Sequence, residues 1–178
     1  MKTLQMGDNT GIWIPQMELW TPPPNPCQMT FNQAADLARS QTTHTTGAWY
    51  FEMTITAASD VTKVGVGIDN GVESLTMQAG QGGSICWVGS GQVNYNGVFG
   101  AYTASPFSVG DILGVDTDLT GGTIRFRVNG NAFSSNFSIS AVIGGSVWAL
   151  AQLKNPGDQI TANFTGSFAF TPPDTAWG

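Results

Sequence analysis

The stretch Gly122-Thr-Ile-Arg-Phe-Arg-Val-Asn-Gly130 decides the fold class of this chain. Its Ile, Phe and Val residues alternate with Thr and Arg, which is the period of a β-strand with one buried face and one solvated face. Asn129 and Gly130 then supply two residues that accept positive φ, as a tight type I′ hairpin turn requires. The stretch therefore predicts a strand that ends in a hairpin.

The segment just upstream, Gly110-Asp-Ile-Leu-Gly-Val-Asp116, has the composition of a partner strand. The short stretch Leu119-Thr-Gly-Gly122 separates the two segments and favours a turn. We therefore expect them to form an antiparallel pair.

Further segments on either side have the pattern of strands. Aromatic and apolar residues form short runs that are bounded by Gly, Asn and Ser. These segments are 47–53, 64–68, the hairpin 87–97 with a turn at Gly91, and the closing strand 162–166 with Phe168, Phe170 and Pro172 behind it.

In content and order these motifs resemble the SPRY domain family, and the resemblance covers residues 47–172. It implies an all-β fold, an antiparallel β-sandwich of the concanavalin A-like jelly-roll type. It also implies a function in binding rather than catalysis. In this family loops at one end of the sandwich bind the ligand, and the corresponding loops here are 57–63, 69–83 and 91–106.

Six residues of these loops are the candidate binding residues. Aromatic residues with a polar group, set among small residues, suit recognition of a protein or a glycan. We expect Asn96 and Tyr102 to be exposed, and Tyr95 to lie at the edge of the core. The six candidates are Asp69, Asn70, Tyr95, Asn96, Phe99 and Tyr102.

Composition independently favours one domain with a sandwich fold. The chain has 178 residues, enough to bury a core, and 23 of them are glycines, whereas helix formers are scarce. The segment Asn32-Gln-Ala-Ala-Asp-Leu-Ala-Arg39 is compatible with a short helix or with an extended strand before the sandwich. The sequence leaves both open.

The N-terminal part differs in character from the rest. Residues 1–27 form an apolar arm with Trp13, Ile14, Leu19 and Trp20, and its stretch 21–26 is rich in proline, which favours a stiff, extended segment. Residues 28–178 form the sandwich. The arm is expected either to add an edge strand to its own sandwich or to anchor the chain to a neighbouring subunit.

Charged residues make up only 10% of the chain, against about 25% in an average domain. A surface with few charges suits packing against neighbours, because little desolvation opposes assembly. The net charge of −6 argues against nucleic acid, which needs a basic patch. No apolar run is long enough to span a bilayer, and the N-terminus does not have the pattern of a signal peptide.

The sequence offers no catalytic constellation. The segment Asp116-Thr-Asp118-Leu-Thr120 resembles a phosphatase nucleophile motif but lacks the strand–helix context, so its aspartates are expected at a hairpin turn. Glu18, Glu52 and Glu73 stand alone, whereas glycoside cleavage needs paired carboxylates.

Metal and cofactor sites are not expected either. His44 is the only histidine and is expected to be a solvated residue. Cys27 and Cys86 are interpreted as reduced thiols, with their pairing left open. A calcium ion held by loop oxygens, for example from Asp69 or Asp116, is also left open.

We therefore expect a non-enzymatic structural and binding protein of a virion, such as a bacteriophage capsid-decoration or tail-fibre component, made in the host cytoplasm. Its arm would bind other virion subunits, and the chain is expected to form a homo-oligomer such as a trimer. Two alternatives remain: a stand-alone cytoplasmic domain that recognises a peptide, and a fibre sandwich that binds or cleaves a glycan.

Overall fold

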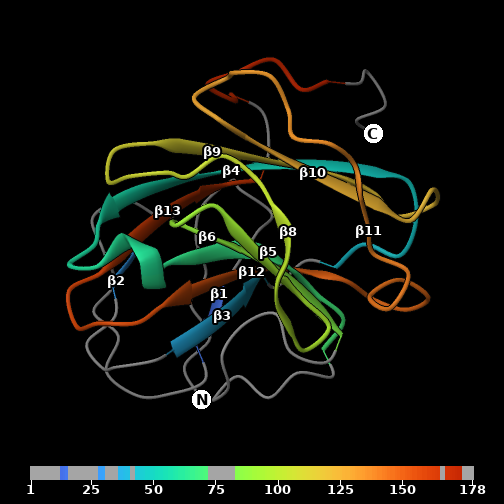
Figure 1. Ribbon diagram of the computed structural model, residues 1–178, viewed down its shortest axis with the longest axis horizontal. Helices are drawn as coiled ribbons and strands as arrows, with labels where there is room; N and C mark the ends of the chain where they lie inside the picture. The colour runs from blue at the N-terminus through green and yellow to red at the C-terminus, as the bar shows by residue number, and fades with distance from the viewer. Residues whose placement is uncertain are drawn as a thin grey trace.

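The computed structural model of the chain describes residues 13–15, 28–30, 36–40, 43–71, 83–164 and 167–173. Within them two antiparallel β-sheets pack face to face (Figure 1). Sheet A has the strand order β1-β3-β12-β5-β6-β7-β8, and sheet B has the order β11-β10-β9-β4-β13-β2. The predicted fold class, an antiparallel β-sandwich, is confirmed.

The strands of both sheets are short, and glycine-rich turns separate many of them. Sheet A contains β1 (Trp13–Pro15), β3 (Asp36–Ser40), β12 (Trp148–Leu153), β5 (Gly65–Asp69), β6 (Ser84–Val88), β7 (Gln92–Tyr95) and β8 (Val98–Thr103). Sheet B contains β11 (Phe137–Ser138), β10 (Thr123–Val128), β9 (Ile112–Asp118), β4 (Ala48–Ala57), β13 (Gln159–Asn163) and β2 (Gln28–Thr30). A single 3₁₀ turn, η1 (Val61–Lys63), follows β4. No helix in the described residues could cross a membrane.

The core lies between the two sheets. Because side chains alternate along a strand, Trp49, Phe51 and Met53 of β4 all point inward and are buried. Trp87 of β6 enters the same core from sheet A and packs against Phe126 of β10, with ring centroids 5.1 Å apart. Its indole Nε1 donates a hydrogen bond to the Ser105 carbonyl at 2.9 Å. That bond satisfies the one polar atom that this large side chain brings into the core.

The hairpin that the sequence predicted most clearly is present. β9 and β10 pair in register, with Val115 opposite Phe126. After β10, Asn129 and Gly130 both have positive φ, 50° and 71°. The Asn131 amide closes the turn by donating to the Val128 carbonyl at 3.0 Å. The chain then returns along β10 as β11.

The segment 167–173 lies on the outer face of sheet B. Glu52, which points away from the core, accepts hydrogen bonds from the backbone amides of Ala169 at 2.7 Å and Phe170 at 3.0 Å. Arg127 donates to the Thr171 carbonyl at 2.8 Å and to the Tyr50 hydroxyl at 2.7 Å. The C-terminal described residues therefore cover the part of this face around Glu52 and Arg127.

Two expectations about element positions need correction. The closing strand is β13, which ends at Asn163, so it begins and ends earlier than the expected span of 162–166. The helical alternative for residues 32–39 is wrong for residues 36–39, because 36–40 form strand β3. Pairing with β12 outweighs a weak local helix propensity.

Part of the predicted arm is an edge strand in this structure. Residues 13–15 pair with β3 of the same chain, with Trp13 opposite Ser40 and Ile14 opposite Arg39. Leu19, Trp20, Cys27 and residues 32–35 lie outside the described residues. Cys86 is buried in β6, and the interpretation of Cys27 and Cys86 as reduced thiols stays a prediction.

Candidate binding surface

The described parts of the three predicted loops lie at both ends of the sandwich, and residues 72–82 of loop 69–83 lie outside the described residues. Loop 57–63 lies at one end, where the Gly89 amide donates to the Val64 carbonyl at 3.2 Å. Asn70 and Asn96 lie at the other end, where the backbone amide of Asn70 donates to the Gly83 carbonyl and that of Asn96 donates to the Ser84 carbonyl. Residues 91–106 reach both ends because most of them do not form a loop but the strands β7 and β8. The expectation of one shared loop surface is therefore wrong.

Asp69 is not an exposed loop residue either. It is the last residue of β5, is fully buried, and forms an ion pair with Arg39 of β3. Its Oδ1 also accepts a hydrogen bond from the Gly71 amide at 2.7 Å. Burial raises the pKa of the Asp69 carboxyl despite the arginine. This carboxylate joins strands of sheet A and does not face solvent.

The polar residues of the second end are bonded within the protein. Tyr95 lies at the edge of the core, as expected, and its hydroxyl accepts a hydrogen bond from the Ala141 amide at 2.8 Å. Asn70 donates to the Ala141 carbonyl at 3.5 Å. Asn96 is exposed, as expected, has a φ of 47°, and accepts a hydrogen bond from the Gly83 amide at 3.3 Å. These side chains mainly hold loops together.

The expectation that Tyr102 is exposed is wrong. Its ring is half-buried and stacks on Phe137, with centroids 4.8 Å apart and planes 15° apart. Tyr102 follows the inward-facing alternation of β8, opposite Val93 of β7. The ring therefore extends the core at the sheet edge.

Phe99 is the predicted residue with the most accessible aromatic surface. It is 55% exposed, and its neighbour Val98 is 58% exposed. Both lie on β8, the last strand of sheet A. Apart from these two, Val109 is the only other large apolar side chain among the described residues that is exposed. An edge strand with exposed apolar side chains is a surface to which another chain can bind.

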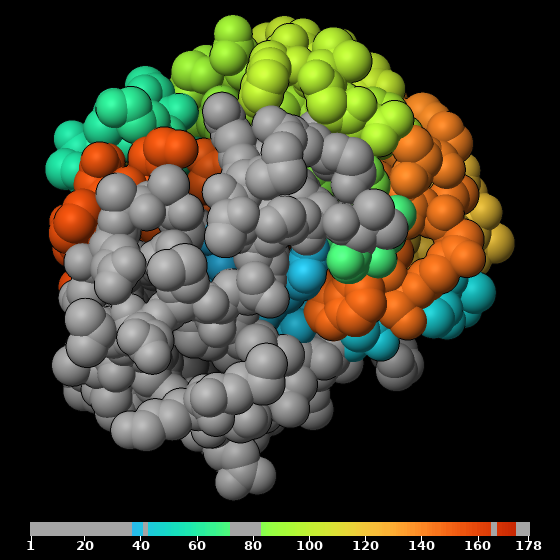
Figure 2. All heavy atoms as spheres, turned by 90° about the horizontal axis from the view of Figure 1, so that it is seen from below, coloured from blue at the N-terminus to red at the C-terminus, as the bar shows by residue number. Residues whose placement is uncertain are grey.

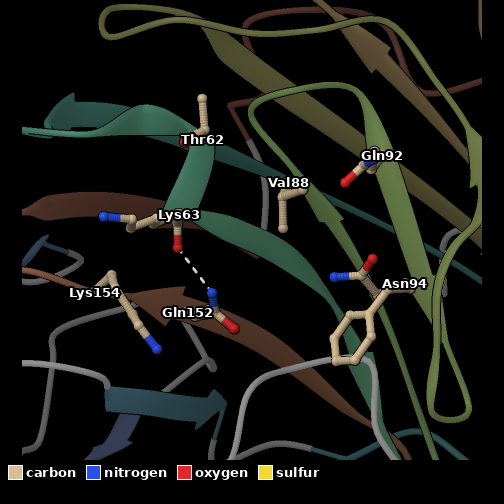
Figure 3. A pocket seen from close by; sticks show the side chains of 8 residues that line it. Thr62, Lys63, Val88, Gln92, Asn94, Gln152 and Lys154 are labelled. Atoms are coloured by element: carbon tan, nitrogen blue, oxygen red, sulfur yellow. Dashed lines mark hydrogen bonds between the residues drawn. The ribbon is translucent and has the colours of Figure 1, made fainter.

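A pocket of about 420 Å³ adjoins Phe99 on the outer face of sheet A. Figure 3 shows Lys63, Gln152 and Lys154 on one side of this pocket, Gln92 and Asn94 on the other, and Val88 between them. In the strand register Gly65 lies between Gln152 and Val88, and the Cys86 sulfur fills the space beside it, so these neighbouring strands pack closely under the pocket. The residues that line the pocket are Thr62, Lys63, Val88, Gln92, Asn94, Phe99, Gln152 and Lys154.

The two segments that carry the lysines are fixed to each other. The Gln152 side-chain amide donates to the Lys63 carbonyl at 2.8 Å. The buried Asp158 accepts hydrogen bonds from the Ser59 amide at 2.9 Å and from the Asn155 amide at 2.9 Å. Figure 2 shows the segments around residues 60 and 155 side by side at the surface, with β7 and β8 next to them. The pocket wall is thus built on a bonded scaffold.

Five of the six cations of the chain lie in the described residues, and they divide into two groups. The three arginines bind groups of the same chain: Arg39 pairs with Asp69, Arg125 with Asp116 at 2.6 Å, and Arg127 holds segment 167–173. The two lysines both line the pocket. Lys63 pairs with the exposed Asp60 at 3.0 Å. Lys154 is the one cation of the described residues whose side chain has no ion pair, hydrogen bond or aromatic partner.

Other residues that the sequence singled out have structural positions. Asp118 accepts a hydrogen bond from the Gly121 amide in the predicted turn, but Asp116 lies within β9 and pairs with Arg125 instead. His44 is half-buried and stacks on Trp49 at 4.2 Å, so the expectation of a solvated histidine is wrong. Within the described residues no three His, Cys, Asp or Glu side chains gather as a metal site would require.

The sequence identified the pocket only in part. Five of its eight lining residues lie in the predicted loop segments 57–63 and 91–106, but Phe99 is the only one of them among the six candidate binding residues. The five are Thr62, Lys63, Gln92, Asn94 and Phe99. Lys63, Val88 and Lys154 are far apart in the chain, and only the strand order β12-β5-β6-β7-β8 brings them together. The one sequence signal of the two lysines is that Lys63 directly precedes the apolar segment 64–68 and Lys154 directly follows the apolar segment 148–153.

The fold and this surface define an antiparallel β-sandwich that presents a pocket and an exposed sheet edge. Residues 48–167 match the family model of the SPRY domain. The chain belongs to the SPRY domain family, whose members are generally non-catalytic protein-binding domains.

Solved structures show the same fold at low sequence identity. The SPRY domain of human HERC1 superposes with a TM-score of 0.69 at 17% identity, over 79% of this chain and 90% of that one. The PSpry domain of TRIM65 gives 0.62 at 16% identity, over 82% and 84%. A human SPRY domain gives 0.59 at 15% identity, over 85% and 100%. Among curated proteins none matches this chain significantly.

Proposed function

We propose that this chain is a non-enzymatic module that binds a partner protein through the pocket of sheet A and the adjoining strand β8. One observation carries the proposal: of the three exposed large apolar side chains in the described residues, Val98 and Phe99 lie on the edge strand β8, and Phe99 also lines the pocket. Exposed aromatic side chains next to a hollow are typical of protein-recognition surfaces.

The strand edge and the pocket would contribute differently to binding. The unpaired backbone edge of β8 provides hydrogen-bonding groups that do not depend on the partner's side chains. The pocket, with its amide groups at Gln92, Asn94 and Gln152, provides specificity for one sequence over another.

Selection from a displayed library of random twelve-residue peptides tests this function. The wild-type chain should enrich a defined set of peptides, and Phe99→Ala should lose them. Val109→Ala is the matched control, because Val109 is 47% exposed but does not line the pocket. Equal loss of binding in both variants, or no loss in Phe99→Ala, would contradict the proposal.

The composition supports a particular setting for this module, a virion component such as a capsid-decoration or tail-fibre protein. Few charges and many polar uncharged residues suit dense packing against other subunits. In this setting the N-terminal residues would anchor the chain, and the sandwich would remain accessible to a partner protein.

Anchoring by residues 1–27 and assembly as a homo-oligomer are part of this proposal. The pairing of residues 13–15 with β3 is compatible with an arm that folds onto its own sandwich or that exchanges between copies. Light scattering of the full chain beside a chain that starts at Gln28 distinguishes the two. An oligomer that becomes monomeric on truncation supports anchoring, and two monomers would contradict it.

A further inference from the structure

We propose that the pocket of sheet A selects an extended peptide segment that lies across the strands and pairs an acidic side chain with an apolar one. This inference deepens the proposed function: it assumes that the pocket binds a partner and names the chemistry of that partner. It starts from the two lysines, which are the only cations of the described residues that line the pocket.

The lysines give the pocket a positive side in an acidic protein. The net charge of the chain is −6, so the lysine side of the pocket is opposite in sign to the protein as a whole. Lys154 has no ionic partner among the described residues, and Lys63 has only the exposed Asp60. Because exposed ion pairs are weak, Lys63 can exchange Asp60 for a carboxylate of the ligand. Charge complementarity therefore favours an acidic segment.

The apolar contact that Phe99 offers lies on the other side of the pocket from Lys154, on the same face of the sheet. Phe99 lies on β8, whereas Lys154 directly follows β12. Four strand spacings separate β12 from β8, which corresponds to about 19 Å. A ligand that touches both must cross the strands.

The distance sets the spacing within the ligand. An extended chain advances ~3.3 Å per residue, and the side chains of Lys154 and Phe99 reach inward from both sides. An acidic residue and an apolar residue separated by about four to six positions would therefore contact Lys154 and Phe99 at the same time. The apolar Val88 and the amides of Gln92 and Gln152 would contact the residues between them.

The peptide library that tests the proposed function also tests this inference. Peptides enriched by the wild-type chain should carry Asp or Glu about four to six positions from an aromatic or aliphatic residue. Lys154→Gln should weaken the affinity for these peptides about five- to tenfold, and Lys154→Arg should retain it. The double variant Lys63→Glu with Lys154→Glu should enrich Lys and Arg in place of Asp and Glu.

Each outcome has a distinct meaning. Peptides without an acidic bias that are still lost in Phe99→Ala overturn this inference and leave the proposed function intact. If the wild-type chain enriches no peptide, both this inference and the proposed function are overturned. Binding of an acidic oligosaccharide such as an alginate fragment, with no peptide enriched, also overturns both, since the partner is then not a protein.

The spacing has its own control. In a synthetic peptide from the enriched set, moving the acidic residue next to the apolar one should reduce affinity as much as Lys154→Gln does. If the moved residue binds equally well, the segment does not lie across the strands, and the inference is wrong in its geometry.

Discussion

Asn129 donates a 2.7 Å hydrogen bond from its Nδ2 to Oδ1 of Asp111, and so joins the end of β10 to the start of β9. The side-chain oxygen of Asn129 also accepts a hydrogen bond from the backbone amide of Ile112 at 2.9 Å, and the backbone amide of Asn129 donates to the Ile112 carbonyl at 2.8 Å. The two dipeptides that flank the hairpin in the sequence, Gly110-Asp111 and Asn129-Gly130, are thus in direct contact. Asn129 therefore ties the two ends of the hairpin to each other.

Replacing Asn129 should destabilise this junction. Asn129→Ala removes the side-chain bonds to Asp111 and Ile112 and places alanine at a φ of 50°. We expect the free energy of unfolding to fall by about 2–3 kcal/mol, measured by urea unfolding. Asn129→Gly loses the same bonds, but glycine adopts a positive φ without strain, so its free energy of unfolding should fall less. Equal losses would mean that the backbone conformation contributes nothing.

Glu52 should hold segment 167–173 on sheet B. Glu52→Ala removes the acceptor of the Ala169 and Phe170 amides and of the Tyr50 hydroxyl. We expect a loss of about 2–4 kcal/mol and faster hydrogen exchange at the two amides. Glu52→Gln, which keeps an acceptor oxygen, should retain part of the protection. Unchanged exchange in Glu52→Ala would show that Arg127 alone holds the segment.

The two aromatic residues of β8 should differ in their effect on stability. Tyr102 stacks on Phe137 and packs against the core, so Tyr102→Ala should lower the free energy of unfolding by about 2 kcal/mol or more. Phe99 is mostly exposed, so Phe99→Ala should change it by no more than about 0.5 kcal/mol. Thermal unfolding of both variants measures the difference, and the reverse order would contradict the assigned burial.

His44 should make stability depend on pH. Burial against Trp49 lowers the pKa of its imidazole below the ordinary value of 6.5. The unfolded chain therefore takes up a proton near pH 6.5 while the folded chain does not, and stability falls as the pH decreases below 6.5 until the folded pKa is passed. His44→Phe keeps an aromatic ring there and should remove this part of the pH dependence.

The measurement is direct because the chain has a single histidine. Its imidazole signals in an NMR titration should move with a midpoint below pH 6.5. A midpoint at or above that value, or identical pH profiles of stability for the wild type and His44→Phe, would contradict the prediction.

The elements that the sequence predicted well are those with local signals. Residues 122–130 contain both the alternation of a strand and the turn that ends it, so no distant contact is needed to interpret them. Hairpin 87–97 was predictable for the same reason. Segment 36–40 was ambiguous because only its pairing with β12 makes it a strand.

The candidate site was predicted poorly because burial and partners are set by distant residues. Asp69 has the composition of a loop ligand, and only the position of Arg39, thirty residues away, makes it a buried ion pair. Glycine and asparagine around Tyr102 indicate a loop, whereas pairing with β7 makes that segment a strand. Lys63 and Lys154 carry no motif, and the strand order alone places them in one pocket.

Segment 167–173 makes the two broad faces of the molecule unlike. Glu52 and Arg127 hold its backbone over part of the outer face of sheet B, while the pocket lies on the outer face of sheet A. A support, a label or a neighbouring protein that approaches from the side of segment 167–173 leaves the pocket unobstructed. For the proposed binding function, this is the side by which the domain should be tethered.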